Sequence, residues 1–322
     1  MEISLLDRYR GAMVGVHVGD AIGAPYESWG PKKIADDITR RGGLTFFDYE
    51  NPWKHELGPK RLPAGRPTDD SDQTADLAWS LIECKGLDTT HLREALRDSV
   101  LQHKSRLWEG TALGAGGTTK GALSDDPAKV AEAMQNNIGT NGSLMRSVPL
   151  ILFYGGMDDI DDALRAMSSV THANEHSIEA CFMYTEYFLT LLSGWSRTDT
   201  FRRLEEEIVD GYGSFLKQRI IFSLADEKLF PIDPGAWPAR GTAEFSLYAA
   251  LWCFKHSTSF ADGIERAVRI GGDTDTYAAI AGGLLGAYYG YEAIPLEWRQ
   301  TILGHDVMVD YAEKLYELNQ RK

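Results

Sequence analysis

The sequence predicts an all-α protein, and three observations support that prediction. Apolar residues recur at helical spacing through most of the chain. Alternating β-branched residues bounded by turns are nearly absent, and residues 44–49 are the best candidate for a strand. Glycines spaced four apart, which line one face of a helix, occur in two places. With 322 residues, 43% of them hydrophobic and 25% charged, we expect one compact globular domain over residues 1–322.

The expected helices follow from the positions of the apolar residues. Leu77, Ala78, Leu81 and Ile82 form one stripe along a helix over residues 74–85. Residues 41–67 and 230–241 are rich in Pro, Gly and aromatic residues and are expected to form long ordered loops. The same apolar spacing predicts helices over residues 4–18, 90–102, 158–170, 177–192, 201–209, 243–254 and 306–318, and small residues follow helical spacing over residues 277–290.

The two glycine sets predict a close approach between a helix and another segment of backbone. Glycine in a helix costs about 1 kcal/mol relative to alanine, so its repetition on one face needs a reason. Tight packing is a sufficient reason in a chain of this composition. The sets are Gly11, Gly15, Gly19 and Gly23 near the start of the sequence, and Gly282, Gly286 and Gly290 near its end.

Charge and cysteine content exclude several classes of function. The formal charge of −14 disfavours nucleic-acid binding, because a phosphate backbone is held by clustered Lys and Arg. Cys84, Cys181 and Cys253 show no pattern typical of disulfides or zinc sites. The N-terminal residues do not resemble a secretory signal, and the longest uncharged apolar run, residues 276–291, is too short to span a bilayer. We therefore expect a cytoplasmic protein with no membrane or nucleic-acid partner.

Three acidic segments, residues 19–27, 68–74 and 271–276, lie at the edges of expected helices. Asp, Ser and Thr are common helix caps, but a cap needs only one or two such side chains. Six residues of the second and third segments supply four carboxylates and two hydroxyls, namely Thr68, Asp69, Asp70, Asp273, Asp275 and Thr276. Neither segment contains a Lys or Arg, and Glu27 adds a fifth carboxylate. The oxygen donors of these side chains suit hard divalent cations, and the charge of five carboxylates suits two such ions. The candidate ligands are Thr68, Asp69, Asp70, Asp273, Asp275, Thr276 and Glu27. A two-metal site of this kind serves phosphoryl transfer and glycosidic hydrolysis alike.

These residues resemble the motifs of the ADP-ribosylglycohydrolase family, over residues 8–290 of the chain. The family includes dinitrogenase-reductase-activating glycohydrolases, ADP-ribosylarginine and ADP-ribosylserine hydrolases, and J1 crystallins. Ser71 stands where the family's Thr-Asp-Asp-Thr motif has its last threonine. The matching segments, in order, are the glycine-rich residues 11–27 ending in Glu27, Thr68-Asp69-Asp70, residues 114–119 ending in Thr-Thr, the Asn-Gly-x-x-Met-Arg helix start at residues 141–146, Thr171-His172, and the intact Gly-Gly-Asp-Thr-Asp-Thr at residues 271–276.

The resemblance implies an orthogonal helical bundle of the ADP-ribosylglycohydrolase type, with two Mg²⁺ or Mn²⁺ ions held by the candidate ligands named above. It also implies that Glu27, Asp69, Asp70 and Asp275 take part in catalysis, with Glu27 as a flexible ligand or as an acid/base. Carboxylates beside the anomeric carbon would stabilise its oxocarbenium character as the glycosidic bond breaks.

The diphosphate of ADP-ribose requires hydrogen-bond donors, which glycine-rich backbone near a helix N-terminus supplies. Residues 114–119 and 141–143 fit that description, and His172 is a candidate side-chain donor, although a structural histidine is the alternative. Tyr26, Trp29 and Trp108 are candidates for stacking on adenine, with core packing as the alternative. The expected substrate-binding residues are Gly114, Gly116, Gly117, Thr118, Asn141, Gly142, Ser143 and His172.

The function that the resemblance implies is hydrolysis of ADP-ribose from a modified acceptor, with arginine on a protein as the expected acceptor and ADP-ribose as the product. Small-molecule substrates, O-linked ADP-ribosylserine and other ADP-ribose derivatives stay open. A catalytically silent, crystallin-like protein that binds ADP-ribose is an alternative from another class, as is a dinuclear phosphoesterase. The presence of every expected metal ligand counts against the crystallin-like alternative.

Overall fold

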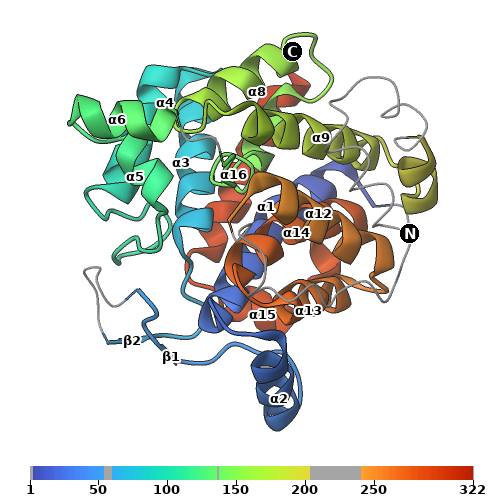
Figure 1. Ribbon diagram of the computed structural model, residues 1–322. Helices are drawn as coiled ribbons and strands as arrows, with labels where there is room; N and C mark the ends of the chain where they lie inside the picture. Colours follow the sequence, from blue (N-terminus) through green and yellow to red (C-terminus); the bar gives the residue numbers. More distant parts are fainter. Residues whose placement is uncertain (1–2, 54–59, 136–137, 204–240, 322) are drawn as a thin grey trace.

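The computed structural model describes residues 3–53, 60–135, 138–203 and 241–321, and these are almost entirely helices and connecting turns (Figure 1). The all-α prediction is confirmed. The helices are α1 (Leu5–Gly23), the 3₁₀ turn η1 (Ala24–Tyr26), α2 (Pro31–Arg41), α3 (Asp69–Cys84), α4 (Thr89–Val100), α5 (Gly117–Ala122), α6 (Pro127–Met134), α7 (Val148–Tyr154), α8 (Ile160–Ser169), α9 (Glu175–Leu192), α12 (Ala243–His256), α13 (Phe260–Ile270), α14 (Thr274–Tyr289), η2 (Tyr291–Ala293), α15 (Leu296–Thr301) and α16 (His305–Gln320).

Most of the helices predicted from apolar spacing are present, although their ends differ. Helix α3 begins at Asp69, so the acidic segment is its first turn and not a loop before it. Helix α1 continues to Gly23 and thereby carries Asp20 in its last turn. Of the helix predicted over residues 201–209, residues 201–203 are helical and the others lie outside the described residues, as does the loop predicted at 230–241 except for its last residue.

The strand predicted over residues 44–49 is wrong except for its last residue. Only Tyr49–Glu50 (β1) is extended and paired, and it pairs antiparallel with Arg61–Leu62 (β2). One aromatic side chain of this segment, that of Phe47, packs on helical neighbours instead. The Phe47 ring lies 5.6 Å from that of Tyr26 and 3.4 Å from the guanidinium of Arg41, the last residue of α2.

Helices α1 and α14 pack against each other at the centre of the molecule, with α3 and α4 on one side and α12 and α13 on the other (Figure 1). The predicted close approach is confirmed, and its partner is the second glycine set. A Cβ added to Gly15 would overlap the carbonyl oxygen of Gly282, and one added to Gly282 would overlap that of Gly15. Because both obstacles are backbone, only glycine permits this spacing.

The α1–α14 contact brings two of the acidic segments together. At the C-terminal end of α1, the carbonyl oxygen of Gly23 accepts a hydrogen bond from the Thr274 hydroxyl over 2.9 Å. The C-terminal end of α1 therefore lies beside the N-terminal end of α14. Glu27 follows the first of these ends and Asp275 belongs to the second.

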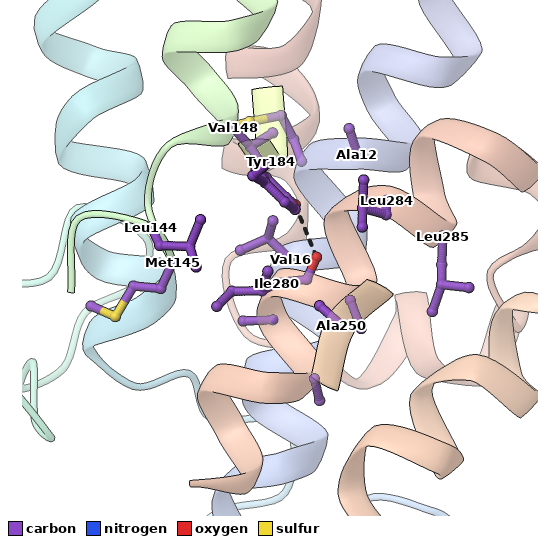
Figure 2. Close-up of a cluster of buried hydrophobic side chains, with 14 of the residues drawn as sticks. Ala12, Val16, Leu144, Met145, Val148, Tyr184, Ala250, Ile280, Leu284 and Leu285 are labelled. Carbon is purple, nitrogen blue, oxygen red and sulfur yellow. Dashed lines mark hydrogen bonds between the residues drawn. The ribbon is translucent and has the colours of Figure 1, made fainter. Parts of the chain in front are cut away.

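The apolar core surrounds the same pair of helices. Figure 2 shows Ala12 and Val16 of α1, Ile280 and Leu284 of α14, and Tyr184 of α9 in one cluster. Tyr184 is fully buried, and its hydroxyl donates to the Ile280 carbonyl oxygen over 2.9 Å. This hydroxyl is the one polar side-chain atom among these five residues, and the hydrogen bond satisfies it. No described helix combines the length and the apolar run that a bilayer-spanning segment requires.

Candidate active site

A cavity of about 300 Å³ lies where the three acidic segments meet the glycine-rich segments. Its lining contains every residue expected to bind metal or substrate except Thr68 and Ser143. It also contains Trp53, Thr119, Thr140, Met145, Gly241 and Gly272. The fold thus gathers residues from α3, α5, α14 and the intervening turns around one space. The expected residues that line it are Glu27, Asp69, Asp70, Gly114, Gly116, Gly117, Thr118, Asn141, Gly142, His172, Asp273, Asp275 and Thr276.

Asp20, in the last turn of α1, fixes the first turn of α3. Its carboxylate accepts from the Thr68 backbone N–H at 2.9 Å and from the Thr68 hydroxyl at 2.7 Å. It also accepts from the Ser71 N–H at 3.1 Å and from the Ser71 hydroxyl. The Thr68 hydroxyl is thereby held against Asp20, and Thr68 is not among the residues that line the cavity. Sequence reasoning found the acidic segment containing Asp20 but gave this residue no role, because its partners are about fifty positions away.

The segment after Glu27 is tied to the start of α14 by two backbone hydrogen bonds. Ser28 N–H donates to Gly272 O over 2.7 Å, and Gly272 N–H donates to Trp29 O over 2.9 Å. Gly271 has a positive φ of 76°, and a Cβ there would lie 2.7 Å from Trp29 O. This tight pairing sets Glu27 opposite Asp273 and Asp275.

Asp275 belongs to two clusters of three carboxylate side chains each. Ligand oxygens of Asp20, Asp70 and Asp275 lie within 4.8 Å of one another, and so do those of Glu27, Asp273 and Asp275. Asp70 Oδ1 and Glu27 Oε2 are buried without a hydrogen-bond partner. Within the described part of the chain, no Lys or Arg forms an ion pair with Glu27, Asp70 or Asp275. Buried polar atoms without partners are rare, so these two oxygens call for a ligand.

Burial and mutual repulsion disfavour the charged forms of these carboxyls. Burial, and then the charge of Asp273, raises the pKa of Glu27 to about 8. Burial and the neighbouring carboxylates raise the pKa of Asp70 and of Asp275 well above the usual range. A divalent cation would remove both penalties, since it supplies the missing positive charge and binds the partnerless oxygens. The donor set is all oxygen, which suits hard cations and not zinc.

Asn141 connects the glycine-rich side of the cavity to the acidic side. Its Nδ2 donates to Asp273 Oδ2 over 2.8 Å and to Ser246 Oγ over 2.9 Å. Its backbone N–H donates to Gly241 O over 2.9 Å, beside the isolated bridge between Thr140 and Thr242. Besides lining the cavity as expected, Asn141 therefore holds one of the carboxylates in position.

The helix start expected at residues 141–146 is wrong. These residues form turns, and α7 begins at Val148. Pro149 favours the first turn of a helix because it has no N–H to leave unpaired, which fixes the start seven residues after Asn141. No helix N-terminus therefore points from residues 141–143 to the cavity. Ser143 is fully buried and accepts from the Ser168 hydroxyl over 2.8 Å, so its side chain does not line the cavity.

The glycine-rich loop at residues 114–119 does lead into a helix, because α5 begins at Gly117. Gly114 adopts a φ of 106°, which favours glycine, and a Cβ there would lie 2.7 Å from Asp69 Oδ1. Added Cβ atoms on Gly116 and Gly117 would meet no atom within 4 Å. The backbone of these two residues is thus open to a ligand.

His172 lies on the cavity wall with its ring almost wholly buried. Burial, and then the charge of Arg146, lowers the pKa of His172 to about 3, so the ring is neutral at physiological pH. Among the aromatic candidates, Tyr26, Trp29 and Trp108 do not line the cavity, whereas Trp53 does. Tyr26 is buried and packs edge-on against Trp29 and Phe47. Composition marked residues 41–67 as aromatic-rich but did not distinguish Trp53.

Comparisons with known proteins agree with these features. The sequence model of a family described as ADP-ribosylglycohydrolase matches residues 1–322. ADP-ribosylarginine hydrolase Tri1 of Serratia proteamaculans is 27% identical over 98% of this chain and 80% of its own length. ADP-ribosylhydrolase ARH3 of Mus musculus is 25% identical over 98% of this chain and 92% of its own length. A solved structure of an "ADP-ribosylglycohydrolase-related protein complex" superimposes with a TM-score of 0.74 and 27% identity, covering 98% of this chain and 99% of the other.

Proposed function

The chain belongs to the ADP-ribosylglycohydrolase family, whose members are glycosidic-bond hydrolases, and on that premise we propose that it removes ADP-ribose from modified arginine side chains of proteins. The motif resemblance is confirmed by the match over the whole chain. Arginine is supported by two relatives named ADP-ribosylarginine hydrolase, at 27% and 26% identity. We further propose that residues 1–322 act as one domain.

The observation that carries the proposal is that two chemically unlike walls line one cavity. One wall holds Glu27, Asp70 and Asp275, and the other holds the open glycines Gly116 and Gly117. A ligand that has hydroxyls at one end and a diphosphate farther along would match both walls. The terminal ribose of ADP-ribose carries such hydroxyls next to its anomeric carbon. The diphosphate is attached at the other end of this ribose.

The cation proposal rests on the carboxylates of the acidic wall. Two Mg²⁺ or Mn²⁺ ions would be held by Asp69, Asp70, Asp273, Asp275 and Glu27, with Thr68 and Thr276 adding hydroxyl oxygens. The Thr276 hydroxyl already lies 3.3 Å from Asp70 Oδ2, and the Thr68 hydroxyl lies 3.4 Å from it. When bound, such ions polarise the oxygens of the substrate and help to orient it and a water molecule.

The chain's own residues would complete the chemistry. Glu27 lines the cavity close to Asp273 and Asp275, so its carboxyl is placed to exchange a proton with the leaving group or with water. Asp70 and Asp275 would stabilise positive charge on the anomeric carbon. Glycine backbone at residues 114–117 and the ring of His172 would bind the diphosphate side. Asp70, Asp275 and His172 are buried, which strengthens their electrostatic interactions.

The test is ADP-ribose release from matched arginine-linked and serine-linked ADP-ribosyl peptides, with Mg²⁺ or Mn²⁺ and with EDTA. Metal-dependent release from the arginine peptide alone supports the proposal, and Asp70→Asn serves as the matched inactive variant. Release from the serine peptide alone would show that the acceptor is serine and not arginine. Recovery of cleaved phosphate esters would instead indicate a phosphoesterase. Tight ADP-ribose binding without release from either peptide would indicate another acceptor or a silent binding protein.

A further inference from the structure

A continuous run of buried hydrogen bonds joins the acidic wall of the cavity to His172. Gln73 Nε2 donates to Asp69 Oδ2 over 2.6 Å, and Gln73 Oε1 accepts from Arg146 Nη1 over 2.7 Å. Arg146 Nη2 donates to the Thr171 hydroxyl over 2.7 Å, and that hydroxyl lies 2.7 Å from His172 Nδ1. All five side chains are buried. The proposed function gives a role to the two ends of this run but not to its three middle residues.

Arg146 is an unusual centre for such a run. It is fully buried, and within the described residues it forms no ion pair with a carboxylate. Burial lowers the pKa of Arg146 to about 10, which still leaves it charged at neutral pH. A buried charge without a counterion costs several kcal/mol, so this one is expected to have a purpose beyond packing. Its two bound partners are both neutral oxygens, those of Gln73 and Thr171.

The chemistry of a guanidinium fixes the direction of the bonds on its far side. Arg146 can only donate, so the Thr171 oxygen accepts from it. The Thr171 hydroxyl still has one proton to donate, and His172 Nδ1 is its only remaining partner among the described residues. A buried hydroxyl proton without an acceptor is costly. Thr171 therefore donates to His172 Nδ1, and the neutral ring carries its own proton on Nε2.

His172 Nε2 faces the cavity. His172 is 3% exposed and lines the cavity. Its Nε2 has no hydrogen-bond partner in the described part of the chain and keeps a small exposed surface. A Cβ on Gly142 would lie 2.9 Å from Nε2. Any side chain at position 142 would therefore crowd the His172 ring near Nε2, and glycine leaves that space open.

We propose that Gln73, Arg146 and Thr171 are positioning residues that fix His172 as a neutral Nε2–H donor to an oxygen of the bound ADP-ribose and hold Asp69 in the same network. The identity of the ligand rests on the proposed function. The buried guanidinium of Arg146 would set the His172 donor on the diphosphate side and the Asp69 carboxylate on the metal side relative to each other. Hydrogen-bonded partners behind a binding residue commonly have this effect on its orientation and tautomer.

The test is nitrogen-15 NMR of the histidine rings in the intact protein, combined with calorimetry of ADP-ribose binding. In the unmodified protein we expect Nε2 of His172 to be protonated and Nδ1 to be unprotonated across the neutral pH range. Thr171→Val keeps the side-chain shape but removes the hydroxyl, so we expect mixed tautomers and roughly tenfold weaker ADP-ribose binding. Thr171→Ser restores the hydroxyl and is expected to restore both properties.

The control is Thr185→Val, which removes another buried hydroxyl. Among the described residues, that hydroxyl donates only to the Cys181 carbonyl oxygen, over 2.8 Å. It should change neither the tautomer nor the affinity. A protonated Nδ1 in the unmodified protein, or equal effects of the two valine variants, would overturn the positioning role. Failure of the unmodified protein to bind ADP-ribose would overturn the proposed function instead, and the NMR result, which needs no ligand, would still decide the role of Thr171.

Discussion

Asn141 donates from Nδ2 to Asp273 Oδ2 over 2.8 Å, although 132 positions separate the two residues. Asn141 belongs to a turn on the glycine-rich side of the cavity, and Asp273 is the N-cap residue of α14. The contact fixes one oxygen of a carboxylate that also belongs to a group with Glu27 and Asp275. One amide therefore connects the wall proposed to bind the diphosphate with the wall proposed to bind cations.

The first prediction concerns this amide. Asn141→Ala removes the donor to Asp273, so the carboxylate gains rotational freedom, and Mn²⁺ affinity is expected to fall roughly tenfold to a hundredfold. Calorimetric titration with Mn²⁺ measures the change. Ser246→Ala is the control, because it removes only the other acceptor of Asn141 Nδ2. Mn²⁺ binding by Asn141→Ala at the unmodified affinity would mean that Asp273 needs no support from this side.

The second prediction concerns Asp275, which belongs to both carboxylate groups. Asp275→Asn keeps an oxygen that can accept from the Thr276 N–H, as Oδ1 does now at 2.9 Å, but removes one buried negative charge. We expect a higher melting temperature in EDTA, because repulsion with Glu27 and Asp70 is relieved. We also expect the rise in melting temperature on adding Mn²⁺ to disappear, because ligand binding no longer stabilises the folded state. A variant that still gains stability from Mn²⁺ as the unmodified protein does would refute the assignment.

The sequence predicted the central helices well for a physical reason. Helices α1, α3, α9 and α14 are long enough for apolar or small residues to repeat over several turns. Helix α7 was missed because all seven of its residues are buried, which leaves no polar face and hence no periodicity. Helices α5 and α15 have six residues each, less than two turns, and are too short for a periodic pattern.

Site residues could be predicted where their chemistry is local and not where it depends on packing. Asp69, Asp70, Asp273 and Asp275 stand out because carboxylates crowd together in the sequence itself. Asp20 has no acidic residue beside it in the sequence, because Glu27 is seven positions away. Only the packing of α1 against the start of α3 shows that Asp20 holds Thr68 and Ser71. Nothing local distinguishes Gln73 from an ordinary helical glutamine, since its partners lie on another turn and another segment.

The third prediction concerns the helix contact that brings the acidic segments together. Gly282→Ala gains about 1 kcal/mol of helix propensity but places a Cβ against the Gly15 carbonyl. Because that obstacle is backbone, the helices must separate, at a cost on the order of 3 kcal/mol or more. Urea unfolding should show net destabilisation, with weaker Mn²⁺ binding in the folded fraction. Gly30→Ala, whose Cβ would meet no atom within 4 Å, should change both quantities little, and equal stability of the two variants would contradict this account.

The fourth prediction concerns the pH dependence of stability at Asp37, which is buried on α2. Burial alone would raise the pKa of Asp37, but hydrogen bonds from Arg41 and Arg40 outweigh it and hold the pKa below its ordinary value of 3.8. A depressed pKa means that stabilisation is present above 3.8 and is lost as the pH falls through the lower, folded-state value.

Asp37→Asn should therefore destabilise the protein by about 1 kcal/mol at neutral pH, and the difference should vanish in acid. Thermal unfolding of both proteins from neutral to acidic pH measures it. Asp36→Asn changes an exposed neighbour on the same helix and should leave the melting temperature unaltered. A constant difference between unmodified protein and Asp37→Asn at every pH would show that packing, and not charge, accounts for the effect.

The fifth prediction separates chemistry from binding at Glu27. Its Oε2 is buried without a hydrogen-bond partner, and burial followed by the charge of Asp273 raises its pKa to about 8. Glu27→Gln preserves the shape but cannot exchange a proton, so at saturating Mn²⁺ turnover should fall by roughly 10²–10⁴ while ADP-ribose affinity hardly changes. Glu50→Gln is the same substitution at an exposed site and should be silent in both assays. Parallel losses of turnover and affinity in Glu27→Gln would show that this carboxyl shapes the site without transferring a proton, since only a group acting in the transition state affects turnover selectively.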